Sequence, residues 1–255
     1  MWLVGLGLLG VAWVLCKLKP TVQLYVKFLT YYTFMSASAV VVMFLSMLSP
    51  GNANNFRYLI PPFGVCSLLL GIRAELRDLH NLESDKPYIL VSNHQSSLDF
   101  IGVSMMIPRR CTFLAKKELL YAGPFGLACW LCGCIFIDRM HHESAISTMV
   151  NTASTIKRKN VIVWIFPEGK RNPKKGLQPF KKGAFHLAVQ AQVPVVPVVF
   201  SGYHFYEKKK RLDAGRFTIT ALPPVSTAGL TGDDVGALTE DIRQRMLDVY
   251  NKTTS

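Results

Sequence analysis

Residues 88–99 read Tyr-Ile-Leu-Val-Ser-Asn-His-Gln-Ser-Ser-Leu-Asp, a short apolar run that passes at once into a polar segment. Three further apolar runs of similar length occupy residues 111–115, 161–166 and 195–200. Short continuous apolar runs are typical of strands that are buried on both faces of a mainly parallel sheet. The sequence therefore predicts an α/β domain with a central, mostly parallel sheet flanked by helices.

Helical patterns lie between and after these runs. Apolar residues recur at three-to-four spacing in residues 145–156, 184–191 and 235–249, so each segment is predicted to form a helix that covers the sheet. A capping-box pattern at residues 231–234 precedes the last of them. Residues 216–222 alternate between apolar and polar side chains and are predicted to form a late, more peripheral strand.

Residues 119–137 form a charge-free apolar stretch that hydropathy alone would take for a membrane span. Gly123-Pro124, Gly126 and Gly133 interrupt it, and its last residues suit a short buried strand. We therefore expect a helix followed by a core strand. The choice matters, because a true span here would separate the polar segments before and after it by a membrane.

Apolar residues are concentrated near the N-terminus, where three segments are predicted to contact a membrane. Residues 2–16 lack the basic start of a signal peptide, so we interpret them as a retained anchor. Residues 28–48 carry no charge and are long enough to cross a hydrocarbon core of ~30 Å. Residues 58–72 are interrupted by two prolines and suit an interfacial or packed helix at the entrance to the α/β domain.

The composition changes from residue 73 onward, where charged residues become frequent. We therefore expect a membrane anchor in residues 1–72, arranged as a helical hairpin, and an α/β domain in residues 73–255. Lys17, Lys19 and Lys27 fall between the first two apolar segments, which places that connector in the cytosol by the positive-inside rule. Two full spans and a hairpin that dips into one leaflet are both compatible with this pattern, and they place the α/β domain on opposite sides of the membrane.

The net charge of +13 favours a partner that carries negative charge, although solubility alone is an alternative reading. Nucleic acid, an anionic membrane surface and phosphorylated small molecules are the candidates, and the apolar anchor argues against nucleic acid. The cysteines do not make a disulfide framework in so long and apolar a chain. Cys129-x-x-Cys132-x-Cys134 lacks a second ligand pair nearby, so we interpret these residues as buried and not as metal ligands.

The polar segment after the first predicted strand carries the strongest chemical signal. In an α-helix, residues at the spacing of His94 and Asp99 are rotated by about 140°, so the two could meet only where a strand end turns before a helix begins. In that geometry Asp99 accepts a hydrogen bond from His94 Nδ1 and leaves Nε2 to take a proton from a hydroxyl group. The alternative is a surface histidine beside an aspartate that starts a helix.

A second polar segment follows another predicted strand. Gly169 permits a tight turn, Arg171 suits bidentate phosphate binding, and Glu168 could hold the guanidinium in place. Lys117 and Arg139 also follow predicted strands and would add positive charge at strand ends. A polar loop with one ion pair is the alternative.

Four segments, taken in order, resemble the glycerolipid acyltransferase family, and within it the 1-acylglycerol-3-phosphate acyltransferases. They are residues 93–99, 117–139, 166–172 and 193–197. The similarity covers most of the chain after the first two apolar segments. One departure is Lys170, where the family usually has threonine, which raises the local charge.

The resemblance implies transfer of a fatty acyl group from acyl-coenzyme A to the sn-2 hydroxyl of 1-acyl-sn-glycerol-3-phosphate, at the endoplasmic reticulum membrane. His94 would be the general base and Asp99 would orient it, while backbone N–H groups near the start of the following helix would stabilise the oxyanion. No metal, no other cofactor and no covalent acyl-enzyme would be needed. The residues expected to bind substrate are Lys117, Arg139, Glu168, Gly169 and Arg171.

Two alternatives stay open. The first is an acyltransferase of the same family that uses another acceptor, such as lysophosphatidylcholine or glycerol-3-phosphate. The second is a non-enzymatic membrane protein whose basic face binds anionic lipid.

Overall fold

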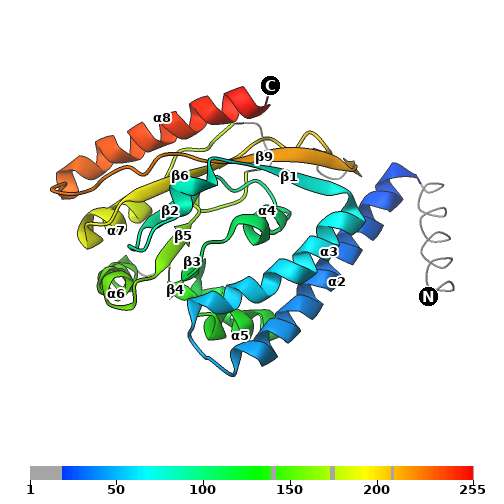
Figure 1. Cartoon of the computed structure of the whole chain (residues 1–255), viewed down its shortest axis with the longest axis horizontal. Coiled ribbons are helices and arrows are strands. Elements are labelled where there is room, and N and C mark those ends of the chain that lie inside the picture. Colours follow the sequence, from blue (N-terminus) through cyan, green and yellow to red (C-terminus); the bar gives the residue numbers. More distant parts are fainter. Residues whose placement is uncertain (1–18, 139–141, 173–175, 208–209, 255) are drawn as a thin grey trace.

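The computed structural model describes residues 19–138, 142–172, 176–207 and 210–254, with the backbone alone described for residues 142–149. The first predicted apolar segment, residues 2–16, lies outside the described residues. The described chain forms a central sheet between two layers of helices (Figure 1).

The central sheet has seven strands in the order β1-β9-β6-β2-β5-β3-β4. They are β1 (Ile72–Arg77), β2 (Ile89–Ser92), β3 (Cys111–Lys116), β4 (Ile135–Ile137), β5 (Ile162–Ile165), β6 (Val195–Phe200) and β9 (Gly215–Ala221). Neighbouring strands of this sheet are parallel except β6 and β9. A separate antiparallel pair consists of β7 (Tyr206–Glu207) and β8 (Arg211–Leu212). The predicted, mostly parallel sheet is therefore confirmed.

The register of the central strands determines where a site can form. Leu90 of β2 lies opposite Trp164 of β5 and Val196 of β6. Because these strands are parallel, their carboxyl ends reach the same edge of the sheet, where binding sites of α/β proteins gather. The polar segments that follow β2 and β5 therefore begin side by side, at the carboxyl ends of these two neighbouring strands.

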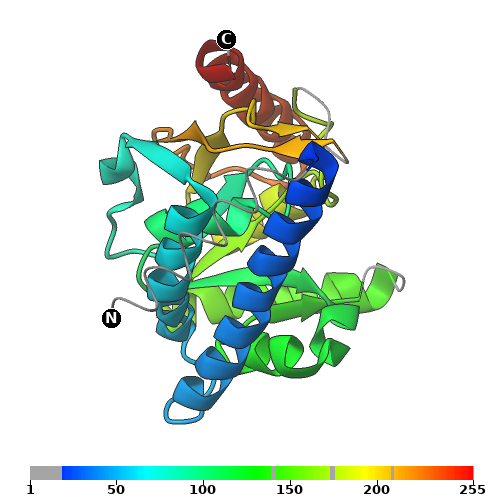
Figure 2. The same cartoon turned by 90° about the vertical axis from the view of Figure 1, so that its right-hand side faces the viewer.

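Helices cover both faces of the sheet (Figures 1 and 2). One layer contains α2 (Pro20–Ser46), α3 (Ile60–Leu70), α4 (Asp99–Met106) and α5 (Gly123–Leu131); the other contains α6 (His142–Lys159), α7 (Gly183–Ala191) and α8 (Val235–Thr254). Short 3₁₀ helices are η1 (Ala53–Leu59), η2 (Leu79–Leu82), η3 (Lys117–Tyr121) and η4 (Gly232–Asp234). The three helices predicted after the sheet strands are confirmed as α6, α7 and α8.

Alternate strand residues face the two helical layers. Leu90 packs in the core beneath α2 to α5, and its neighbour Ile89 packs beneath α6 to α8. Fully buried residues such as Ile101 and Ile242 each contribute about 1.5–3 kcal/mol through the hydrophobic effect. The capping box predicted before α8 is also confirmed, since Asp234 Oδ2 accepts the Thr231 backbone N–H at 2.8 Å.

The apolar stretch at residues 119–137 folds into the domain, as predicted. It forms the end of η3, the helix α5 and the strand β4. The nine residues of α5 are too few to cross a bilayer. Gly126 is required in this helix, because a Cβ there would lie 2.3 Å from the Leu120 carbonyl oxygen. The carboxyl ends of β2, β3 and β5 therefore face the same side of the molecule.

The strands at the two lateral edges of the sheet differ from the prediction. The strand predicted at residues 216–222 is β9, but it is not peripheral, since it lies between β1 and β6. The strand β4, which was expected in the core, lies at one edge of the sheet, and two of its three residues are only partly buried. The strand at the other edge is β1, which was not predicted and which pairs with β9 in parallel, Ile72 opposite Gly215. The charged side chains of β1 indicate, from the sequence alone, only a domain boundary.

The interfacial helix predicted at residues 58–72 is in fact shorter. It corresponds to α3, which is followed directly by β1. Pro61 and Pro62 lie in its first turn, where a missing backbone N–H removes no intrahelical hydrogen bond. The prolines therefore begin this helix and do not interrupt it.

The segment predicted at residues 28–48 makes up most of α2, which begins earlier, at Pro20. Lys27 consequently lies inside the helix and not in a loop before it. Its Nζ donates to the Leu212 carbonyl oxygen of β8 at 2.6 Å. The side of the membrane on which Lys27 lies stays a prediction.

One side of α2 packs on the domain, although the helix is long and apolar enough to cross a membrane by length and composition. Tyr31 and Val42 of α2 and Phe63 of α3 belong to the same hydrophobic core as the sheet. The division of the chain at residue 73 stays a prediction, because these helices and the sheet share that core.

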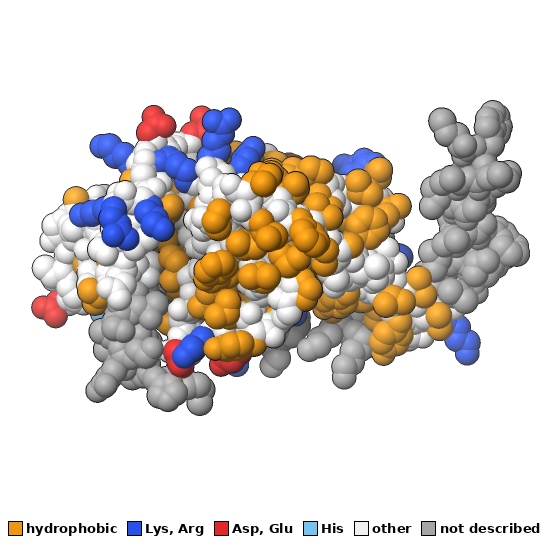
Figure 3. Space-filling view, turned by 90° about the horizontal axis from the view of Figure 1, so that it is seen from below, with side chains coloured by type: hydrophobic (Ala, Val, Ile, Leu, Met, Phe, Trp, Pro, Cys, Tyr) orange, Lys and Arg blue, Asp and Glu red, His pale blue; other side chains and the backbone are white. Residues whose placement is uncertain are grey.

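The other side of α2 and the outer sides of α3 and α5 expose large apolar side chains. We call this surface the apolar face. It consists of Tyr25, Leu29, Phe44, Leu45, Leu48, Val65, Leu68, Leu69, Leu127 and Trp130. Figure 3, viewed from below, shows hydrophobic side chains gathered over this part of the molecule, with Lys and Arg at the margins. Exposed apolar surfaces of this extent mark membrane or partner contacts.

Candidate active site

His94 and Asp99 meet at the edge of the sheet where β2 ends. The distance from His94 Nδ1 to Asp99 Oδ2 is 2.6 Å. Since β2 ends at Ser92 and α4 begins at Asp99, the residues between them form the turn that the spacing required. The predicted contact is confirmed, and the catalytic role of the pair stays a prediction.

The Asp99 side chain is 1% exposed, yet donors surround its carboxylate. The backbone N–H of Gln95 donates to Oδ2 at 2.8 Å, and that of Ser96 donates to Oδ1 at 3.1 Å. The Tyr203 hydroxyl also donates to Oδ1, at 2.8 Å. Both carboxylate oxygens thus accept hydrogen bonds from fixed donors. Asp99 therefore accepts from His94 Nδ1–H, which leaves the lone pair of the imidazole on Nε2.

The Tyr203 hydroxyl is a fixed donor to Asp99. Burial and the Asp99 charge raise the pKa of Tyr203 well above its usual value, so the hydroxyl keeps its proton. Its ring packs against Phe205 and Phe217, at centroid distances of 5.2 Å and 4.9 Å. These contacts aim the hydroxyl at the carboxylate.

The segment that follows β5 holds His94 in place. The Phe166 ring stacks on the imidazole with 4.2 Å between centroids. The backbone N–H of His94 donates to Glu168 Oε1 at 2.9 Å, and its carbonyl oxygen accepts the Asn172 N–H at 2.7 Å. With 17% of its side chain exposed, the imidazole can still be reached from outside.

Glu168 has a different role from the one expected. Its side chain is buried, and its carboxylate accepts the backbone N–H groups of His94, at 2.9 Å, and Gln178, at 3.1 Å. Burial raises the pKa of Glu168, and these two hydrogen bonds oppose the rise. No ion pair joins Glu168 to Arg171 in the part of the chain that the structure describes. The expected guanidinium contact was wrong, because backbone donors occupy the carboxylate.

Gly169 makes the turn that leads to Arg171. Its φ of +72° favours glycine, and a Cβ there would lie 3.0 Å from Lys181 Cε. Arg171 is exposed. Burial raises the pKa of Tyr206 and the Arg171 charge opposes that rise, which places the guanidinium in the neighbourhood of β7. Within the described ranges Arg171 has no ion pair, so its charge is open to an anion.

Lys117 follows β3 at the same edge of the sheet. Its Nζ lies 3.3 Å from Asp138 Oδ2, next to the end of β4, and its side chain is half exposed. Arg139 lies outside the described residues, so the structure gives no account of its position.

The backbone N–H groups expected to stabilise an oxyanion are partly occupied. Those of Gln95 and Ser96 donate to Asp99, and that of Leu98 donates to Ser96 Oγ at 3.3 Å. The turn uses these three groups to hold residues 93–99, so they are not open to an oxyanion. Oxyanion stabilisation by other N–H groups near the start of α4 stays a prediction.

Helix α2 also contacts this segment. The Tyr31 hydroxyl donates to the Ser97 carbonyl oxygen, and the Tyr32 hydroxyl lies 3.1 Å from Ser97 Oγ. Tyr31 is fully buried, whereas Tyr32 is exposed. The helix that carries much of the apolar face is thereby hydrogen-bonded to residues 93–99.

Comparison with known proteins identifies the family. The acyltransferase family model matches residues 73–201, half of the chain. The chain belongs to the acyltransferase family. The matched range contains His94 and Asp99 as well as the second polar segment, whereas Tyr31 and Tyr203 lie outside it.

Individual acyltransferases agree with this assignment. The 1-acyl-sn-glycerol-3-phosphate acyltransferase alpha of Homo sapiens is 44% identical over 239 residues, which are 93% of this chain and 84% of that protein. The 1-acyl-sn-glycerol-3-phosphate acyltransferase of Saccharomyces cerevisiae is 38% identical over 194 residues, 74% of this chain and 64% of that protein. The crystal structure of the LPA acyltransferase PlsC from Thermotoga maritima shares the fold, with a TM-score of 0.71 at 22% identity, covering 92% of this chain and 99% of that one.

Sequence reasoning missed three residues of this acyltransferase's site, namely Tyr31, Tyr32 and Tyr203. Tyr203 is separated from Asp99 by 104 positions, and Tyr31 is 66 positions from Ser97. No local pattern connects such distant residues. The only trace was a pair of tyrosines, Tyr31 and Tyr32, in an otherwise apolar segment.

Proposed function

We propose that this acyltransferase transfers a fatty acyl group from acyl-coenzyme A to the sn-2 hydroxyl of 1-acyl-sn-glycerol-3-phosphate, releasing phosphatidic acid and coenzyme A. The activities after which the human and yeast relatives are named support the acceptor. The single observation that carries the chemistry is the His94–Asp99 pair at 2.6 Å, with Nε2 left for a substrate. The carboxylate is buried and the imidazole is reachable, as a general base requires.

In the proposed mechanism His94 Nε2 takes the proton of the sn-2 hydroxyl while its oxygen attacks the thioester carbonyl. The new C–O bond forms, the C–S bond breaks, and the proton on His94 passes to the leaving thiolate of coenzyme A. Asp99 stabilises the imidazolium that exists between these two proton transfers. The mechanism includes no metal, no other cofactor and no covalent acyl-enzyme.

Arg171 is proposed to hold the phosphate of the acceptor. It lies on the segment that also fixes His94, so a phosphate bound there would place a glycerol hydroxyl near the imidazole. Gly169 supplies the turn, Glu168 fixes the backbone, and Lys117 and Arg139 are proposed to add positive charge at the same edge. A guanidinium binds phosphate through two parallel hydrogen bonds, which gives orientation as well as affinity.

The apolar face supports a location in a membrane, which we propose to be that of the endoplasmic reticulum. Since α2 packs on the domain and shares its core, a helix that lies in one leaflet fits better than a full span for this segment. The proposal keeps the active site beside the leaflet that supplies the lipid acceptor.

An acyl-transfer assay with several acceptors tests this function. Lysophosphatidic acid, lysophosphatidylcholine and glycerol-3-phosphate compete in one reaction, with wild type and Arg171→Ala. We expect lysophosphatidic acid to be preferred, and Arg171→Ala to raise its KM about tenfold while changing kcat little. Preference for lysophosphatidylcholine, or an unchanged KM in the variant, would contradict the assigned acceptor and the role of Arg171.

A further inference from the structure

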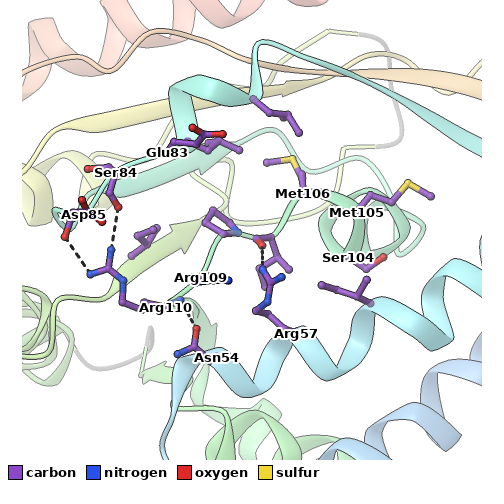
Figure 4. A pocket seen from close by; sticks show the side chains of 16 residues that line it. Asn54, Arg57, Glu83, Ser84, Asp85, Ser104, Met105, Met106, Arg109 and Arg110 are labelled. Atoms are coloured by element: carbon purple, nitrogen blue, oxygen red, sulfur yellow. Dashed lines mark hydrogen bonds between the residues drawn. The ribbon is translucent and has the colours of Figure 1, made fainter.

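A cavity of about 640 Å³ lies at the amino end of β5, away from the carboxyl ends where His94 lies. Figure 4 shows the side chains that line it. It is lined by Ile162, the first residue of β5, and by the turn at residues 107–110 that precedes β3. Because His94 follows the carboxyl end of β2, the two sites are separated by the length of parallel strands. Its volume is in the range of pockets that bind small molecules.

The charges of this cavity are not paired with each other. Arg57 and Arg109 line it together with Glu83 and Asp85, and all four are exposed. Within the described ranges no ion pair connects any of them. Two cations and two carboxylates therefore share one cavity without neutralising each other.

Arg110 has a structural role at this cavity. Its guanidinium donates to the carbonyl oxygens of Ser84, Asp85 and Asn160, at 3.0 to 3.2 Å. The Arg57 guanidinium makes one hydrogen bond, to the Ile107 carbonyl oxygen at 3.3 Å. The Arg109 guanidinium donates none in the described part of the chain. The guanidinium groups of Arg57 and Arg109 are therefore available to an anion.

The remaining lining suits a lipid. Leu79, Leu82, Met105 and Met106 contribute apolar surface to the cavity. Ile60 also lines it and begins α3, whose outer side belongs to the apolar face. Helix α3 therefore connects the cavity lining to the apolar face.

We propose that the cavity binds the head group of a zwitterionic phospholipid that carries a primary ammonium, such as phosphatidylethanolamine. The phosphodiester contacts Arg57 and Arg109, the ammonium contacts Glu83 and Asp85, and the apolar lining takes the first part of an acyl chain. A ligand with both charges satisfies all four side chains, whereas a simple anion would leave the carboxylates facing it.

Calorimetric binding of short-chain lipids to the purified full-length chain in detergent tests the proposal. The probe is dihexanoyl phosphatidylethanolamine; dihexanoyl phosphatidylglycerol lacks the ammonium, and glycerophosphoethanolamine lacks the chains. Arg57→Gln/Arg109→Gln should weaken the probe about tenfold, the loss of about one charge-assisted hydrogen bond. Glu83→Gln/Asp85→Asn should remove the preference for the probe over dihexanoyl phosphatidylglycerol.

Lys19→Gln/Arg73→Gln is the matched charge control. Lys19 precedes α2 and Arg73 follows α3, so both lie at the ends of these helices that are remote from η1. The control removes the same charge as Arg57→Gln/Arg109→Gln. This control should bind the probe as the wild type does. Arg109→Gln alone, which removes no hydrogen bond within the described residues, checks that any loss does not come from unfolding.

Binding of the probe must also be separated from the active site. Arg171→Ala should leave the affinity for the probe unchanged, whatever its effect on acyl transfer. Equal weakening in the cavity variant and the Lys19/Arg73 control would overturn the proposal, because simple net charge would then explain binding. Glycerophosphoethanolamine binding as tightly as the probe would also overturn it, because the ligand would then be a soluble phosphodiester and not a lipid.

Discussion

At the scale of single residues, the Asp99 carboxylate organises the proposed active site. A buried carboxylate is costly unless donors compensate for the lost water, and four groups donate to this one. They are His94 Nδ1–H, the N–H groups of Gln95 and Ser96, and the Tyr203 hydroxyl. Three come from one turn and the fourth from a distant segment, so Tyr203 fixes the turn to the rest of the domain.

Replacing Tyr203 by phenylalanine removes one donor and keeps the ring packing. A hydrogen bond to a charged group contributes about 1.5–3 kcal/mol, so we expect Tyr203→Phe to lower kcat about tenfold or more, with little change in KM. Steady-state kinetics of acyl transfer measure this. Tyr121→Phe, at a side chain that is 76% exposed, is the control and should behave as wild type. A wild-type kcat in Tyr203→Phe would show that Tyr203 does not position Asp99.

The residues of the site were predictable to different degrees. His94 and Asp99 could be paired from sequence because both lie in the short turn between a strand and a helix. So short a connection allows few backbone conformations. Glu168 was placed at the right edge but given the wrong partner, since hydrogen bonds from a side chain to distant backbone leave no sequence pattern. Tyr203 could not be found at all, because only the fold brings it to Asp99.

At the scale of elements, Gly126 allows α5 to pack closely against η3 within residues 119–137. A Cβ at Gly126 would meet the backbone of η3, which cannot give way as a flexible side chain can. The interruption seen in the sequence was therefore a packing requirement. Hydropathy alone could not distinguish this helix and strand of the domain from a span.

Gly126→Ala should consequently lower the free energy of unfolding by about 1–3 kcal/mol, the usual cost of overpacking. Gly64→Ala is the matched control, because Gly64 also lies in a helix and a Cβ there meets nothing within 4 Å. We expect that change to be neutral or to stabilise by up to about 1 kcal/mol. Denaturant unfolding of both variants in detergent measures the difference, and equal effects would contradict the packing argument.

The elements near the N-terminus were predicted least well. Apolar composition located α2 and α3 but could not show which side of each packs on the domain. The start of α2 at Pro20 and of α3 beside Pro61 follows from the tolerance of prolines in a first helical turn. The strand β1 was missed because an exposed edge strand with charged side chains has little apolar signal.

At the scale of the whole molecule, the apolar face and the proposed active site are connected through α2. Tyr31 and Tyr32 contact Ser97 from the same helix that exposes Phe44 and Leu45. Binding of the apolar face to a membrane would therefore fix the position of His94 relative to the leaflet.

A charge on the apolar face should weaken membrane binding without affecting the fold. Leu68 of α3 is 75% exposed, so Leu68→Asp removes no core contact. We expect about a tenfold lower affinity for phosphatidylcholine vesicles, since inserting a leucine contributes roughly 1.5–3 kcal/mol. Leu76→Asp, on β1 and outside the apolar face, should bind as the wild type does. Equal losses in both variants, measured by vesicle co-sedimentation, would show that the apolar face is not the membrane contact.

The central claim is that His94 is the general base, and the kcat of His94→Ala tests it most directly. Acyl transfer from acyl-coenzyme A to lysophosphatidic acid is measured for wild type, His94→Ala and His186→Ala, an exposed histidine on α7. We expect His94→Ala to lower kcat by about 10²–10⁴-fold while vesicle binding stays unchanged, and His186→Ala to retain full activity. Near-normal turnover by His94→Ala would contradict the account.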